Sequence, residues 1–220
     1  MLRSDGTKSE KTGFCPSTDQ ALEILEQIAS NKSYCREQEI SGCDEQDKYL
    51  YRVRRGVVRK FALQQDGRRH ILDFLLEGDF FGFGWRHGYF VEAATDGTVV
   101  SHYSRVRLEA LARSDNDLAQ ALTTISYGAM ARLERHMLIL GKTTALEKVS
   151  CFLLDFSSRV KHQNSNGFAL PISRYDIGDY LAISPETVCR SITELQQRGI
   201  IVLRGPREVR FLNRDAFDLI

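Results

Sequence analysis

The chain has 220 residues, and its 30 Lys and Arg nearly balance its 29 Asp and Glu, so the formal net charge is only +1. This near-neutrality excludes a polybasic protein that binds nucleic acid through bulk charge. The 42 % hydrophobic and 27 % charged residues indicate a globular rather than a disordered chain. The chain shows neither an apolar run of roughly 18 residues nor a signal peptide, so we expect a cytoplasmic protein with no membrane contact.

The cysteines and histidines show no spacing that is typical of a metal site. The cysteines are Cys15, Cys35, Cys43, Cys151 and Cys189, and neither Cys-x-x-Cys nor His-Glu-x-x-His occurs. An odd number of cysteines also argues against a disulfide framework. We therefore expect no metal and no other cofactor. Because histidines and carboxylates do not cluster, we also do not expect an enzyme.

The N-terminal residues 1–18 are polar with scattered charges, and they predict a flexible tail. The next segment, residues 19–30, carries Leu22, Leu25 and Ile28 at helical spacing. This spacing predicts a short helix in front of the first domain, because it places the three apolar side chains on one face.

The segment from 36 to 112 has the pattern of many short strands separated by glycines. Residues 65–67 (QDG) predict a hairpin turn, and a strand is expected over residues 70–75. Several such strands, with turns about ten residues apart, favour a β-barrel within a domain of residues 19–113. The basic residues between 52 and 60 alternate along a hairpin, so most of them are expected on its solvent side.

Residues 114–141 change to a helical period, with apolar residues at intervals of three or four that are close to a heptad repeat. Such a stripe either packs on its own domain or forms a dimer seam. The polar opposite face favours a dimerisation helix. The expected interface residues are Leu118, Leu122, Ile125, Ala129, Leu133, Met137 and Leu140.

Residues 172–199 have the signature of a helix-turn-helix within a C-terminal domain of residues 142–220. Ser173 is expected to cap the first helix, with an aspartate three positions later in a variant of the capping box. Ser184 and the proline after it have the form of a second helix start, and Gly199 closes that helix.

The second of these helices divides into two faces. One face is apolar and is expected to be buried, and the first two turns of the other carry Glu186, Cys189 and Arg190. In a major groove, Arg can donate to guanine O6 and N7, and Glu can accept from cytosine N4. An alternative stays open, in which Glu186 and Arg190 form an ordinary surface ion pair.

Two short apolar runs after Gly199 predict strands on either side of a basic turn, which together form a wing. Arg204, Arg207 and Arg210 lie in or beside this turn and could contact DNA phosphates. A basic hairpin tip is often simply solvated. Its place directly after a helix-turn-helix favours the phosphate contact.

The chain resembles the CRP/FNR superfamily of bacterial transcription regulators, and within it the FNR/FixK branch, over nearly all of residues 20–220. The most specific part is DIGDYL at residues 176–181 followed by ETVCR at residues 186–190, which is similar to the family pattern DIGxYLG…ETxSR. The resemblance implies an α+β chain with an N-terminal cupin-like β-barrel of the cyclic-nucleotide-binding type. A long dimerisation helix and a C-terminal winged helix-turn-helix would follow it.

The resemblance implies a homodimeric transcription regulator that binds double-stranded DNA, and we expect an activator that contacts RNA polymerase. Arg190 would contact a guanine and Glu186 the adjacent base pair, and Cys189 is expected as a third base contact. Pro185 stands where the cyclic-AMP branch has another guanine-binding Arg, so we expect TTGA-type half-sites about 34 Å apart. The residues expected near phosphates, besides the wing arginines, are Ser173, Arg174, Ser184 and Thr187.

The barrel departs from the patterns of both known ligands of the family. Gly82 is followed by Phe83 rather than Glu, and Glu92 would repel a cyclic-nucleotide phosphate. A four-iron cluster needs four thiolates, and the cysteines here are too widely spaced for the FNR pattern. We therefore expect a barrel that works without a small-molecule effector.

Cys189 stands where the FNR motif has a serine. It is either a small neutral substitute or a redox-sensitive thiol, because a helix N-terminus and a neighbouring Arg both favour the thiolate. Oxidation would place bulk or negative charge against the DNA. The second alternative predicts that oxidation of Cys189 weakens DNA binding.

A rival interpretation is an effector-gated barrel, responding to a cyclic nucleotide or another small ligand, whose C-terminal domain contacts protein. Residues 142–220 hold 11 Lys and Arg against 9 Asp and Glu, so even this half is barely basic. Specificity for DNA would therefore rest on base contacts more than on bulk attraction. Binding that weakens steeply with salt would favour DNA over a protein partner.

Overall fold

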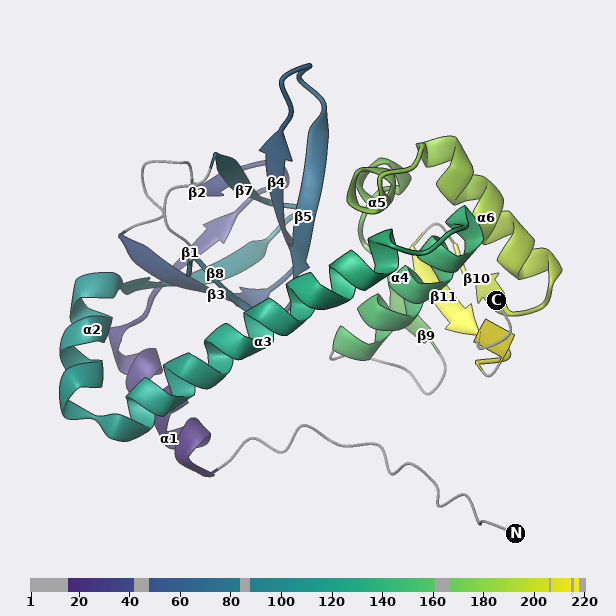
Figure 1. Cartoon of the computed structure of the whole chain (residues 1–220). Helices are drawn as coiled ribbons and strands as arrows, with labels where there is room; N and C mark the ends of the chain where they lie inside the picture. The colour runs from purple at the N-terminus through teal and green to yellow at the C-terminus, as the bar shows by residue number, and fades with distance from the viewer. Residues whose placement is uncertain are drawn as a thin grey trace, which may run out of the picture.

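The computed structural model describes residues 16–41, 48–83, 88–160, 167–205, 207–214 and 216–217. Figure 1 shows a β-rich N-terminal part and a smaller C-terminal part that are connected by one long helix, α3 (Asn116–Leu140). Among the described residues, no helix has both the length and the apolar character that crossing a membrane requires.

The N-terminal part begins with α1 (Pro16–Ile28), so this helix starts within the stretch that the sequence predicts as a tail. Residues 1–15 of that predicted tail lie outside the described residues. The strands then form two antiparallel four-stranded sheets, in the orders β1-β8-β3-β6 and β2-β7-β4-β5. Their bounds are β1 (Ser30–Tyr34), β2 (Glu39–Ser41), β3 (Tyr49–Arg55), β4 (Val58–Leu63), β5 (Arg69–Leu75), β6 (Phe80–Phe81), β7 (Tyr89–Ala93) and β8 (Thr98–Ser104).

The hairpin between β4 and β5 confirms the turn predicted at residues 65–67. Gly67 has a φ of +81°, which glycine adopts without strain, and its amide donates to the Gln64 carbonyl oxygen over 2.9 Å. The ladder pairs Lys60 with Asp73 and then Phe61 with Ile71, so Leu72 is a bulge without a partner on β4. This bulge lies on an edge strand of the described sheet.

Two helices follow the last strand of the barrel. The sequence did not predict α2 (Arg105–Ser114), because it buries only Leu108 and so has no apolar stripe. The long helix α3 starts at the Asp115 N-cap, whose side chain accepts from the Leu118 amide over 2.9 Å. The predicted helix over 114–141 is therefore confirmed as a helix.

The C-terminal part contains three helices and a small sheet with the strand order β10-β11-β9. The winged helix-turn-helix arrangement predicted from the sequence is present, and β9 adds a third strand that was too short to predict. The bounds are α4 (Ala145–Arg159), β9 (Gly167–Ala169), α5 (Arg174–Leu181), α6 (Pro185–Gln197), β10 (Ile201–Leu203) and β11 (Glu208–Phe211).

The barrel and the C-terminal part share one buried apolar cluster. Phe74 of β5 is 1 % exposed, and its ring centroid lies 5.1 Å from that of Tyr180 in α5 and 6.3 Å from that of Phe152 in α4. Because these rings come from both parts, α5 is held against the outer face of β5.

Candidate nucleic-acid interface

The first helix of the helix-turn-helix, α5, begins with the predicted capping box. The Ser173 hydroxyl donates to Asp176 Oδ2 over 2.7 Å, and the Asp176 amide donates back to Ser173 Oγ over 3.0 Å. The turn after α5 passes so close to Gly178 that a Cβ there would lie 2.7 Å from the Ile183 carbonyl oxygen. Glycine is therefore required at this position for the turn to pack.

The second helix, α6, also has the predicted start and faces. Ser184 Oγ accepts from the Thr187 amide over 3.1 Å, and a proline occupies the first helical position. Val188 and Leu195 are 0 % exposed and form the inward face of the helix. Gly199, with a φ of +67°, follows the helix end as expected.

The outward face of α6 presents Glu186, Cys189 and Arg190 to solvent. Hydrogen bonds from its own backbone amide and from the Ser184 hydroxyl lower the pKa of Glu186, and the charge of Arg190 adds to this effect. Among the described ion pairs there is none between Glu186 and Arg190. Both side chains are therefore available to an external partner, and the alternative of a closed surface pair is not supported.

A shallow hollow of about 540 Å³ extends the same face along α6. It is lined by Cys189, Arg190, Thr193, Glu194 and Gln197. The sequence analysis did not select Thr193 and Gln197. They follow Cys189 at intervals of four, so helical spacing alone could have found them.

The residues expected near phosphates differ in their exposure and in whether they already form hydrogen bonds within the chain. Ser184 is exposed and Thr187 is half-buried, whereas the Ser173 hydroxyl is already engaged in the capping box. Burial lowers the pKa of Arg174, and an electrostatic interaction with nearby Cys189 opposes this shift. Arg174 of α5 thus lies close to the exposed face of α6.

The wing places two of its three arginines in solvent. Arg204 and Arg207 are exposed in the hairpin between β10 and β11, where Gly205 has a φ of +71°. Arg210 is half-buried, and its Nε donates to Glu208 Oε1 over 3.2 Å. Arg210 is therefore the least available of the three for a phosphate contact.

The expectation that the basic residues between 52 and 60 lie mostly in solvent is wrong: of these five residues only Arg55 is exposed, and the most deeply buried is Arg59. Its side chain is 4 % exposed, and it donates to Asp176 Oδ1 over 2.8 Å and to Glu92 Oε1 over 2.5 Å. Arg69 joins them, with Nη2 2.7 Å from Asp176 Oδ1 and 3.1 Å from Asp179 Oδ2. We call Arg59, Arg69, Glu92, Asp176 and Asp179 the junction cluster, because it connects the barrel to α5.

Aromatic and aliphatic side chains form the buried cluster inside the barrel. The Tyr51 ring stacks on Phe81 with centroids 4.8 Å apart and meets His102 edge-on at 4.9 Å. His102 Nε2 lies 2.8 Å from the Tyr34 hydroxyl, and burial lowers the pKa of His102 to about 4. These rings occupy the centre of the barrel. Glu92, which the sequence analysis set against a cyclic-nucleotide phosphate, is held by Arg59 in the junction cluster.

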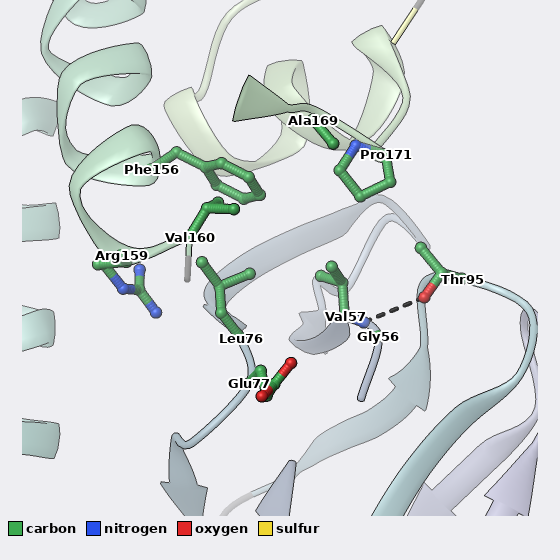
Figure 2. Close-up of a pocket in the computed structure, with 10 residues that line it drawn as sticks. All are labelled: Gly56, Val57, Leu76, Glu77, Thr95, Phe156, Arg159, Val160, Ala169 and Pro171. Carbon is green, nitrogen blue, oxygen red and sulfur yellow. Dashed lines mark hydrogen bonds between the residues drawn. The ribbon is translucent and has the colours of Figure 1, made fainter. Parts of the chain in front are cut away.

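A separate cavity of about 330 Å³ lies between the barrel and the C-terminal part (Figure 2). Apolar side chains such as Val57, Leu76 and Phe156 form its walls. Two of its polar lining residues are hydrogen-bonded: Arg159 donates to Asp79 over 2.8 Å, and Thr95 accepts from the Val57 amide over 3.0 Å. This cavity contains none of the α6 residues and is not part of the candidate interface.

The exposed stripe of α3 differs from the predicted dimer seam. Leu118 is 0 % exposed and packs with α1 in the same chain, so the prediction that it faces a partner is wrong. Leu122 and Ile125 are half-buried against the same cluster. Ala129 and Leu140 are half-buried, whereas Leu133 and Met137 are 43 % and 71 % exposed. The exposed apolar side chains of α3 are Tyr127, Met130, Leu133, Met137 and Leu138.

The described residues contain no group of three or more His, Cys, Asp or Glu side chains arranged to hold a metal ion. Three of the cysteines are described, and all three are free thiols: Cys35 and Cys189 are exposed, and Cys151 is half-buried. Cys15 and Cys43 lie outside the described residues.

Comparison with known families matches both parts of the chain. A family model described as "Cyclic nucleotide-binding domain" matches residues 31–115, and one described as "Crp-like helix-turn-helix domain" matches residues 147–219. These two matches correspond to the barrel and to the part that contains α5 and α6.

Individual relatives are similar over most of their length. The nitrogen fixation regulation protein FixK of Azorhizobium caulinodans is 37 % identical, over 88 % of this chain and 80 % of the relative. The FixK protein of Rhizobium meliloti is 39 % identical, over 76 % of this chain and 75 % of the relative. The solved structure of FixK2 from Bradyrhizobium japonicum is 40 % identical in sequence and has a TM-score of 0.80. The match covers 87 % of this chain and 96 % of the FixK2 chain. This chain belongs to the CRP/FNR family of DNA-binding transcription regulators, in its FixK branch.

Proposed function

We propose that this protein binds DNA as a homodimer and activates transcription from a pseudo-palindromic site with TTGA-type half-sites. The outward face of α6, with Glu186, Cys189 and Arg190 exposed together, carries this proposal. Arg190 can donate twice to a guanine, and Glu186 can accept from a cytosine. Pro185 has no side-chain donor with which to contact a further guanine, which favours TTGA over GTGA. As a regulator of this kind, the protein would act in the cytoplasm and contact RNA polymerase.

The exposed apolar side chains of α3 support a second copy of this chain as the dimer partner. Tyr127, Met130, Leu133 and Met137 follow one another at intervals of three or four, as in a coiled-coil seam. Apolar side chains that are 43–71 % exposed on one helix face gain free energy when a second helix covers them. The dimer seam is therefore these four residues rather than the Leu118 end of the helix.

The barrel would act without a diffusible effector. Its interior is occupied by aromatic rings, and Glu92 is held in the junction cluster. The orientation of the C-terminal part is thus stabilised by side chains of the chain itself. Phosphate contacts would come from Arg174, Ser184 and Thr187 together with Arg204 and Arg207 of the wing, while the capped Ser173 and the paired Arg210 contribute less.

Selection of bound sequences from random DNA with the purified protein tests this proposal. We expect two TTGA-type half-sites in inverted repeat, with centres about 34 Å apart. Affinity for the selected site should fall steeply with salt, because phosphate contacts release counterions. Recovery of no common sequence, together with salt-independent binding to a protein partner, would instead favour the rival function of an effector-gated barrel.

A further inference from the structure

His136 connects three elements that are far apart in the sequence. It lies on α3, is 6 % exposed, and its ring stacks on the Tyr180 ring of α5 with centroids 3.7 Å apart. Its Nε2 lies 2.8 Å from the Tyr180 carbonyl oxygen, and its Nδ1 lies 3.1 Å from the Leu72 carbonyl oxygen of β5. One imidazole on α3 therefore contacts both the barrel and the helix-turn-helix.

In the described part of the chain, neither the Leu72 nor the Tyr180 carbonyl oxygen accepts a hydrogen bond within its own sheet ladder or helix. Leu72 is the bulge in the β4–β5 ladder, so it has no partner on β4. Tyr180 lies in the last turn of α5, where carbonyls have no intrahelical donor. A buried carbonyl without a donor is costly, so a side chain at position 136 that donates to one of them is favourable.

The shorter contact, to α5, is the one that a neutral ring is expected to satisfy. Burial lowers the pKa of His136, and the hydrogen bonds to both carbonyls only partly oppose this effect. The uncharged form of the ring, which this shift favours, carries one N–H. We assign this hydrogen to Nε2 from its 2.8 Å distance to the Tyr180 oxygen.

The position of His136 on α3 gives this hydrogen bond a consequence for DNA binding. Leu133 and Met137, which we assign to the dimer seam, lie within one helical turn of His136 but are exposed. The same turn of α3 thus faces the partner subunit on one side and α5 on the other. Contacts within a single turn of α3 would therefore determine how the helix-turn-helix is oriented relative to the dimer axis.

We propose that His136 is a positioning residue that fixes the helix-turn-helix relative to the dimer axis and thereby sets the half-site spacing that the dimer accepts. This inference rests on the proposed binding of a palindromic site by a dimer. It assigns a role in operator selection to a residue that contacts no DNA.

The test compares the affinity of each variant for two operators, one with the selected spacing and one with a base pair inserted between the half-sites. The insertion moves one half-site by about 3.4 Å and turns it by about 34°. We expect the wild-type protein to prefer the selected spacing by at least about tenfold, or about 1.4 kcal/mol. The ratio of the two dissociation constants is measured on one preparation, so partial unfolding does not change it.

Three substitutions separate hydrogen bonding from packing. His136→Leu removes both contacts, and we expect its preference to fall to about threefold or less. In His136→Gln the amide nitrogen can take the place of Nε2 and donate to Tyr180, so this variant should keep the wild-type preference. In His136→Asn the shorter amide lies near the place of Nδ1, away from Tyr180, so the preference should fall as in His136→Leu. If His136→Leu does not fold, His136→Asn provides the same comparison.

Two results would overturn the positioning role: an unchanged preference in both His136→Leu and His136→Asn, or a loss in His136→Gln as large as in His136→Leu. Arg190→Ala is the matched control, because it should weaken binding to both operators and leave their ratio unchanged. A wild-type protein that binds neither operator would overturn the proposed function and this inference with it. Binding by the wild type with unaltered ratios in the variants would overturn the positioning role alone.

Discussion

The two helices of the helix-turn-helix use their charged residues in opposite ways. In α5, Asp176 is 2 % exposed and is matched by Arg59 and Arg69 from the barrel. In α6, Glu186 and Arg190 are exposed, and neither takes part in a described ion pair. Buried charges are stabilised only when they are paired, whereas exposed charges remain hydrated until a partner arrives. The comparison teaches that one motif carries its buried, paired carboxylate on one helix and the charges proposed to contact bases on the other.

The largest expected effect comes from removing one arginine of the buried junction cluster. Arg59→Ala leaves Asp176 and Glu92 with less compensation in a buried site, and we expect the free energy of unfolding to fall by about 3–5 kcal/mol. Chemical denaturation measures this loss. Arg54→Ala is the matched control, because Arg54 forms an exposed ion pair with Glu26 and should cost about 0–1 kcal/mol. Equal losses in the two variants would contradict a buried, stabilising junction cluster.

Substitution of an exposed charged residue of α6 should weaken DNA binding and leave the stability of the fold unchanged. Arg190→Ala removes a side chain that contacts no acidic partner in the described ion pairs, so the free energy of unfolding should change by less than about 0.5 kcal/mol. Operator binding should weaken by about 1–3 kcal/mol, and discrimination at one guanine should relax. Fluorescence anisotropy with operators substituted at each position measures both. An unchanged base preference at every position would contradict the assignment of Arg190.

The same division between a buried and an exposed face applies to α3. Met137→Asp places a carboxylate in the proposed seam, where burial without a partner is unfavourable, so the dimer dissociation constant should rise about tenfold or more. Analytical ultracentrifugation measures this constant. Val106→Asp is the control, because Val106 is 80 % exposed on α2 and lies outside the seam. If both variants dissociate alike, or neither does, the seam lies elsewhere.

The smallest expected effect is at Cys189. Cys189→Ser should keep operator affinity within about 0.5 kcal/mol, because both side chains are small and neutral. Peroxide should weaken binding by the wild-type protein and leave Cys189→Ser unaffected, since only the thiol can be oxidised to a charged acid. Anisotropy before and after peroxide treatment measures the difference. Equal sensitivity of the two proteins would direct attention to Cys151, the half-buried thiol of α4.

Local sequence determined the features that depend on neighbouring residues. The capping box at Ser173, the Ser184 N-cap and the faces of α6 were predicted because hydrogen bonds and helical spacing act within about one turn. The hairpin turn at residues 65–67 was predicted for the same reason. The exposed face that we propose to contact bases was thus identifiable from α6 alone, without knowledge of what lies beside it.

Only the tertiary structure decided which other surfaces meet. Alternation along β4 could not show that Arg59 faces α5, because its carboxylate partner Asp176 is 117 residues away in the sequence. The heptad pattern of α3 likewise could not separate Leu118, buried against α1, from Met137, which is exposed. His136 had no sequence signal, because its partners are backbone carbonyls and any residue supplies a carbonyl. Short-range hydrogen bonding and periodicity thus determined the candidate DNA-binding face, whereas contacts between distant segments decided how that face is held.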